Sequence, residues 1–179
     1  TGKLKLGNSN PVKTISDESL ADINITTYKI GDGQSYAKTN EKLVPVVDNE
    51  ETLRYIMQKG EETKIHVYTC GSVTEGMQGE TLADMSSLYK AGAVGFTDDG
   101  KPIMDEQLVE NAMNICKELN VPISFHEENP QYISENGINA GYVAEHFGIK
   151  GSDRQAEISM VQRDLEIALK TGACINIQH

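Results

Sequence analysis

Three short apolar runs in this 179-residue chain each end in a residue that can bind a metal ion. One run leads into Asp98, Asp99 and Gly100, and the other two lead into His126 and His179. The carboxyl ends of parallel strands meet at the mouth of a barrel, so we expect these side chains to converge. A carboxylate with imidazoles, and with no thiolate in register, favours a hydrolytic zinc or similar ion over a structural zinc or an iron–sulfur cluster.

Each of these residues also has an ordinary structural interpretation. An Asp-Gly pair such as Asp99-Gly100 favours a tight turn, and a lone histidine such as His126 is common in polar loops. The three matching positions together favour the metal site, with Asp98 as a neighbour rather than a ligand. By contrast, His66 lies within a predicted strand and His146 on a predicted helix, and we interpret both as structural.

Alternating helix and strand patterns from residue 46 onward must position these residues. They predict helices over 49–60, 81–90, 105–119, 140–147 and 153–170, and strands over 64–70, 92–97, 122–125 and 173–179. Such alternation is typical of a parallel sheet with right-handed crossovers. The ligands fall at strand ends and no glycine-rich phosphate loop follows a strand, which favours a TIM-type (β/α) barrel over an open doubly wound sheet. A complete barrel needs about 250 residues, so we expect an incomplete one.

Residues 1–45 have a different pattern from the rest. Charged and apolar residues alternate over 3–6 and 21–26, and a third short run covers 42–44. Alternation of this kind predicts half-exposed antiparallel strands, joined here by Gly- and Asn-containing turns, whereas 34–41 is predicted to be a loop or linker. We therefore expect two domains: a β-rich module over 1–45 and a partial barrel carrying the metal site over 46–179.

Composition limits the classes of partner and the compartment. A net charge of −11 and a pI near 4.8 argue against nucleic acid and anionic membranes as partners, and say little about a small-molecule substrate that is anionic. Cys70, Cys116 and Cys174 are odd in number and far apart, which favours a reducing compartment, and we expect all three to be buried. No apolar run is long enough for a membrane span and no signal-peptide pattern is present, so we expect a soluble, cytoplasmic protein.

The motif around the two aspartates resembles the bacterial class I dihydroorotases. Its most specific part is the stretch FTDDG, residues 96–100, followed by Pro102. The resemblance extends over most of 45–179, and residues 21–45 are similar to the N-terminal β-module of the family. Other matching pieces are PVVDNEETL at 45–53, IHV at 65–67, VPI at 121–123 before His126-Glu127, AE at 156–157, RD at 163–164 and Gln178-His179.

This resemblance implies a metal-dependent cyclic amidohydrolase, a dihydroorotase that interconverts N-carbamoyl-L-aspartate and dihydroorotate in pyrimidine biosynthesis, with two zinc ions per site. Carried over by position, Asp99 would bridge the two metals, and His126 and His179 would be ligands of the second. Hydantoinases and allantoinases use a carboxylated lysine on this strand. No lysine lies between Ala91 and Gly100, which favours the dihydroorotase type.

Two parts of the family pattern do not occur in this chain: the HxH-Leu-Arg motif and the substrate-binding asparagine. The acid/base aspartate of the family lies beyond residue 179, so the catalytic and substrate-binding residues remain unknown. We expect the natural protein to contain further segments. Two alternatives stay open, namely another cyclic amidohydrolase, or an inactive dihydroorotase-like subunit that supports aspartate transcarbamoylase. The expected assembly is a homodimer or a complex with that enzyme.

Overall fold

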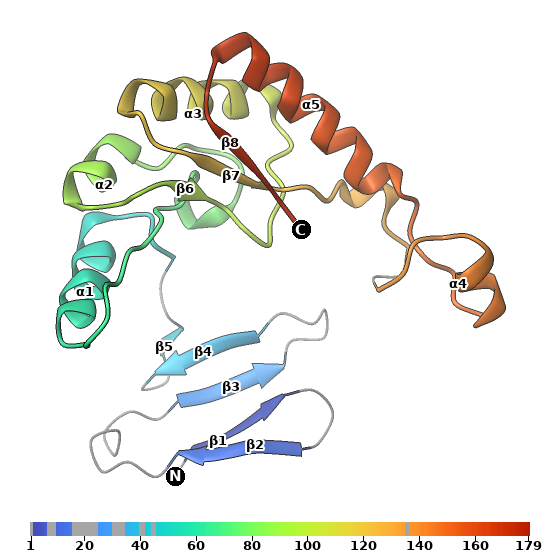
Figure 1. The fold of residues 1–179 in the computed structure, drawn as a ribbon, viewed down its shortest axis with the longest axis horizontal. Coiled ribbons are helices and arrows are strands. Elements are labelled where there is room, and N and C mark those ends of the chain that lie inside the picture. Colours follow the sequence, from blue (N-terminus) through green and yellow to red (C-terminus); the bar gives the residue numbers. More distant parts are fainter. Residues whose placement is uncertain are drawn as a thin grey trace. The chain divides into compact units, whose positions relative to one another are not determined.

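A computed structural model describes residues 2–6, 10–15, 25–29, 35–39, 42–43, 46–134 and 137–179. Contacts between Cα atoms divide the chain into two compact units, Thr1–Pro45 and Val46–His179. Each unit is described by itself below, with the labels of Figure 1.

The first unit consists of short antiparallel strands. Strand β1 (Gly2–Leu6) pairs with β2 (Asn10–Ile15), and β3 (Ile25–Lys29), β4 (Ser35–Thr39) and β5 (Lys42–Leu43) form a second sheet in that order. The prediction of a loop over 34–41 is wrong, because β4 pairs with a neighbouring strand on each side. The sequence of β4 is mostly polar and therefore resembles a loop, but main-chain pairing with β3 and β5 makes it a strand. Most of the predicted strand over 21–26 lies outside the described residues.

The second unit alternates helices with short strands, as its sequence pattern predicts. Its helices are α1 (Glu50–Glu61), α2 (Met85–Ala91), α3 (Glu106–Leu119), α4 (Tyr142–His146) and α5 (Gln155–Thr171), with 3-10 turns at Glu75–Met77 and Pro130–Tyr132. Its strands are β6 (Phe96–Thr97), β7 (Ile123–His126) and β8 (Ile175–Gln178). Asn49 caps α1, because its side chain accepts a hydrogen bond from the Thr52 N–H.

The three strands of this unit form a parallel sheet in the order β6-β7-β8. The strand predicted over 64–70 is wrong: residues 64 and 65 lie in a bend, and pairing is confined to 69–71, where the Val94 N–H donates to the Thr69 carbonyl and Gly71 bridges to Phe96. Ile65 and Tyr68 are 74% and 69% exposed, so no packing in the described chain holds them in a longer ladder. The unit is thus a mixed α/β fold with a small, open parallel sheet.

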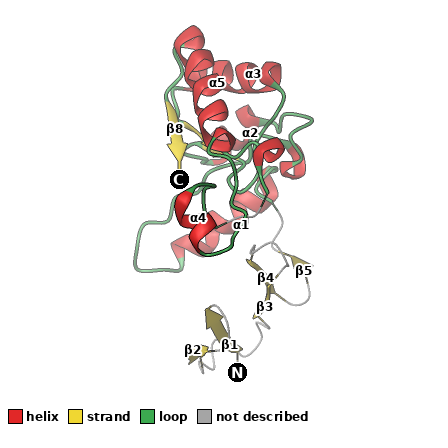
Figure 2. Ribbon diagram, turned by 90° about the vertical axis from the view of Figure 1, so that its right-hand side faces the viewer, coloured by secondary structure: helices red, strands yellow, loops and turns green. Residues whose placement is uncertain are grey.

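The core of the second unit lies on the helical side of this sheet. Along β7, Ile123 and Phe125 are buried, whereas Ser124 and His126 are only partly buried. The buried pair packs in one cluster with apolar residues of the neighbouring helices. Figures 1 and 2 show α3 and α5 lying side by side above the strands. The period of two therefore leaves the opposite face of β7 free for polar side chains.

The three cysteines differ in exposure. Cys116 of α3 is buried, and burial raises the pKa of its thiol to about 12. Cys70 and Cys174 are exposed, so the prediction of three buried thiols is wrong for these two. They lie next to the two outer edges of the sheet, beside Gly71 and β8.

Within the described residues, we find no helix long and apolar enough to span a lipid bilayer.

Candidate metal centre

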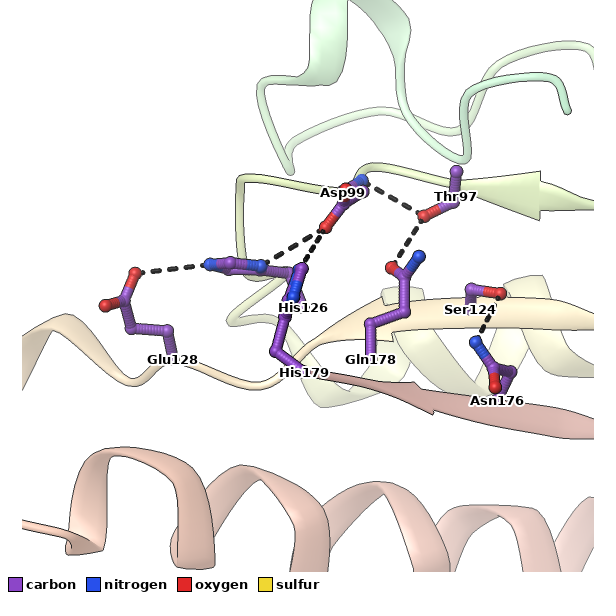
Figure 3. Close-up of polar contacts among 8 residues, drawn as sticks. All are labelled: Thr97, Asp99, Ser124, His126, Glu128, Asn176, Gln178 and His179. Carbon is purple, nitrogen blue, oxygen red and sulfur yellow. Dashed lines mark hydrogen bonds and ion pairs between the residues drawn. The ribbon is translucent and has the colours of Figure 1, made fainter. Parts of the chain in front are cut away.

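Three side chains from the ends of three neighbouring strands converge in the second unit (Figure 3). His179 Nε2 lies 3.0 Å from Asp99 Oδ1, and His126 Nδ1 lies 3.3 Å from the same oxygen. One ligand atom from each residue falls within 4.8 Å of the others. The two imidazole rings meet edge to face, with centroids 5.1 Å apart. These are the three residues that the sequence pattern singled out.

The strands place these side chains by simple register. His126 ends β7 and pairs with Gln178 of β8, so that His179 follows one residue beyond this pair. Thr97 ends β6 and pairs with Ser124 of β7, and Asp99 follows Thr97 by two residues. The chain then turns: Lys101 N–H donates to the Asp98 carbonyl, and Gly100 has a φ of 90°, a conformation that favours glycine. The segment 98–101 is thus a turn, as its Asp-Gly pair favours, and also places the candidate ligand Asp99.

The ring of His126 is held so that one nitrogen faces the cluster. Its Nε2 lies 3.2 Å from Glu128 Oε2, while its buried Nδ1 has no hydrogen-bond partner, despite its proximity to Asp99. In the tautomer that carries its proton on Nε2, toward Glu128, Nδ1 would offer its lone pair to a metal ion beside Asp99. A buried imidazole nitrogen beside a carboxylate, with a second imidazole next to them, fits a divalent cation.

Electrostatics favour a charged Asp99. Partial burial alone would raise the pKa of this carboxyl, but its hydrogen bond with His179 and the nearby positive charge of His179 and His126 outweigh that effect. The net result is a lowered pKa for Asp99. Its side chain is 44% exposed, so it also remains accessible to solutes. An ionised, accessible carboxylate is the form that coordinates a metal.

Asp98 has a different role from its neighbour. It is 3% exposed, and its carboxylate accepts hydrogen bonds from the N–H groups of Val73 and Thr74 and from the Thr74 hydroxyl. Burial raises the pKa of Asp98, although these hydrogen bonds oppose the shift. Asp98 therefore anchors the 73–74 segment to the end of β6 and does not join the ligand cluster.

A cavity of about 410 Å³ opens beside the ligands. Both histidines line it, together with Glu128, Asn139, Arg154 and Gln178. This volume lies within the usual range for small-molecule sites. The position of Glu128 could have been expected from sequence, because it lies two residues after His126. Asn139 and Arg154 lie in later segments of the chain, and no spacing in the sequence indicated that they would line this cavity.

A buried cluster of ionisable side chains follows His126 at the end of β7. Glu127 is 6% exposed and Asp164 of α5 is fully buried. Burial, reinforced by the charge of Asp164, raises the pKa of Glu127 to about 8. Arg163 Nε lies 2.7 Å from Asp164 Oδ1, and its Nη1 donates to the Ile103 carbonyl. Arg163 thus ties α5 to the segment before α3, and the Glu127 carboxyl, just after β7, lies near Asp164.

The other two histidines lie outside the ligand cluster. His66 stacks on Tyr68 with ring centroids 6.5 Å apart, and His146 lies between Tyr142 and Phe147 at 6.4 and 5.0 Å. Among the described residues, the only group of three or more potential ligands that could hold a metal ion is Asp99, His126 and His179.

Fold and site together define a class of protein: a parallel α/β unit with a candidate metal centre at the carboxyl ends of its strands. The family model described as dihydro-orotase-like matches residues 9–179. The chain belongs to the dihydroorotase-like family.

Curated relatives agree with this assignment. Proteins named dihydroorotase from Clostridium acetobutylicum, Clostridioides difficile and Streptococcus pneumoniae are 54%, 50% and 41% identical to the chain over 135 residues. In each case the match covers 75% of this chain and 32% of the relative. The chain thus spans about a third of the length of these relatives.

Proposed function

We propose that this protein is a dihydroorotase, a metal-dependent cyclic amidohydrolase that interconverts N-carbamoyl-L-aspartate and dihydroorotate in pyrimidine biosynthesis. The observation that carries this proposal is the convergence of Asp99, His126 and His179 at three strand ends in a chain of the dihydroorotase-like family. The small-molecule cavity beside these residues supports it. A cytoplasmic location, suited to a soluble biosynthetic enzyme, is part of the same proposal.

The residues present fit a zinc site. Asp99, His126 and His179 would hold the metal: Asp99 would be the carboxylate shared by two zinc ions, and the two histidines would be ligands of the second ion. Bound zinc would supply Lewis-acid chemistry, polarising a ring carbonyl and lowering the pKa of water. Glu128 keeps the His126 ring oriented, and a carboxylate behind a ligating imidazole also raises the basicity of the ring.

One face of the sheet carries polar side chains next to the proposed site. Thr97 is hydrogen-bonded to Gln178, and Ser124 to Asn176, on the face that carries the candidate ligands (Figure 3). In a closed (β/α) barrel this face would line the interior. We propose that residues 46–179 form part of such a barrel and residues 1–45 a separate β-rich module, because parallel strands with helices on one side are its repeating unit.

A panel of cyclic amides tests the substrate assignment. The zinc-loaded complete protein should hydrolyse dihydroorotate and should act far more slowly on hydantoin and allantoin, because no lysine precedes Asp99 on its strand. Ring opening is followed by ultraviolet absorbance. Faster turnover of hydantoin or allantoin would instead assign another cyclic amidohydrolase. Zinc-replete protein that turns over none of the three would indicate an inactive subunit, for which binding to aspartate transcarbamoylase is the next assay.

A further inference from the structure

One hydroxyl group links two of the segments that carry the candidate ligands. Thr97 Oγ1 accepts a hydrogen bond from the Asp99 N–H at 3.0 Å and donates one to Gln178 Oε1 at 3.2 Å. Asp99 is itself a candidate ligand, and Gln178 directly precedes His179. Figure 3 shows both bonds converging on the Thr97 side chain.

The geometry matters because these segments are not neighbours in the sheet. Thr97 belongs to β6 and Gln178 to β8, while β7 lies between them. Main-chain pairing therefore does not connect the Asp99 segment directly to the His179 segment. The threonine side chain bridges them across the face of β7, on the same side as the ligand cluster.

A hydroxyl has one proton to donate and lone pairs with which to accept. Thr97 uses the proton toward Gln178 and a lone pair toward the Asp99 N–H, so each contact has a definite direction. Valine has nearly the same shape but offers neither function. Serine keeps both. Substituting Thr97 with valine or with serine therefore separates the hydrogen-bonding role of the hydroxyl from the shape of the side chain.

From this arrangement we infer that Thr97 is a positioning residue of the metal centre, which sets the distance between Asp99 and His179. The inference rests on the proposed function, since it concerns the metal that the site would hold. Hydrogen-bonding partners behind metal ligands typically alter affinity by about 10–100-fold. The Asp99–His179 separation of 3.0 Å is the quantity that Thr97 would control.

A matched control lies in register on the neighbouring strand. Ser124 pairs with Thr97, lies on the same face of the sheet, and accepts a hydrogen bond from Asn176 Nδ2 at 3.3 Å. Its hydroxyl also reaches β8, but its hydrogen bond is with Asn176 and not with Asp99 or with Gln178, the residue next to His179. Loss of this hydroxyl removes a side-chain bond to the same strand while leaving the link between ligand segments intact.

The experiment compares zinc affinity of the complete protein by competition with a chromophoric chelator, alongside the visible absorption of the cobalt-substituted form. Thr97→Val should weaken zinc binding by about tenfold or more and alter the cobalt spectrum. Thr97→Ser should restore both, and Ser124→Ala should leave both near wild type. If Thr97→Val does not fold, Gln178→Met removes the other end of the same hydrogen bond and should show the same loss.

Two results would overturn the inference. The first is Thr97→Val protein with wild-type zinc affinity and an unchanged cobalt spectrum. The second is an equal loss in Thr97→Val and Ser124→Ala, which would show a general effect of the sheet face. Wild-type protein that binds no zinc would refute the metal centre of the proposed function itself, and is therefore distinguished from failure of the Thr97 inference alone.

Discussion

Replacing Asp99 with alanine should reduce both zinc affinity and dihydroorotate turnover by about two orders of magnitude or more. Residues behind a metal ligand already affect affinity by about 10–100-fold, and Asp99 is proposed to be a direct ligand shared by two ions. Its Oδ1 is also the atom on which both histidines converge. The variant should be assayed for bound zinc by elemental analysis and for ring opening of dihydroorotate.

The stability of this variant separates a ligand from a structural residue. Because the Asp99 side chain is 44% exposed, its loss should change the free energy of unfolding of the metal-free protein little. Glu118→Gln, on the exposed surface of α3, serves as a remote carboxylate control and should behave as wild type in both assays. Asp99→Ala protein with full zinc content and full turnover would contradict the bridging role.

Replacing Asp98 with alanine, unlike replacing Asp99, should lower the free energy of unfolding of the metal-free protein substantially, by about 2–4 kcal/mol. The substitution leaves the buried N–H groups of Val73 and Thr74 and the Thr74 hydroxyl without their acceptor. A buried donor that loses its partner costs its full desolvation penalty. Urea unfolding of the metal-free protein, followed by circular dichroism, measures the change.

A second aspartate provides the comparison for Asp98. Asp84 also accepts a backbone N–H, that of Ser87 at the start of α2, but at the surface. Asp84→Ala should therefore cost less than Asp98→Ala, because water can replace the lost acceptor. Equal effects of the two substitutions, or an unchanged unfolding midpoint in Asp98→Ala, would show that the buried hydrogen bonds of Asp98 do not anchor the 73–74 segment.

Helices of the second unit could be predicted closely because their signals are local. Asn49 and Asp105 cap α1 and α3 through their own side chains, and glycine at position 172 follows α5. Strand lengths could not be predicted in the same way. The apolar run before Asp98 contributes only Phe96–Thr97 to the sheet, since strand length depends on partners elsewhere in the chain.

The convergence of Asp99, His126 and His179 was predictable because it depends on strand register rather than on side-chain detail. Parallel strands bring their carboxyl ends together, so a ligand-type residue at each end is sufficient to expect convergence. The supporting contacts were not predictable. Glu128 beside His126, and Thr97 beside Gln178, depend on side-chain positions that only the folded sheet defines. The separate roles of the adjacent residues Asp98 and Asp99 likewise follow from the opposite directions of their side chains.

The most direct test of the central proposal is metal removal and restoration on a single preparation of the complete protein. Zinc content and dihydroorotate hydrolysis are measured before dialysis against a chelator, after it, and after zinc is added back. If Asp99, His126 and His179 form a hydrolytic zinc centre, hydrolysis should disappear with the bound zinc and return as zinc is restored. Protein that is free of metal and still hydrolyses dihydroorotate at the original rate would contradict it.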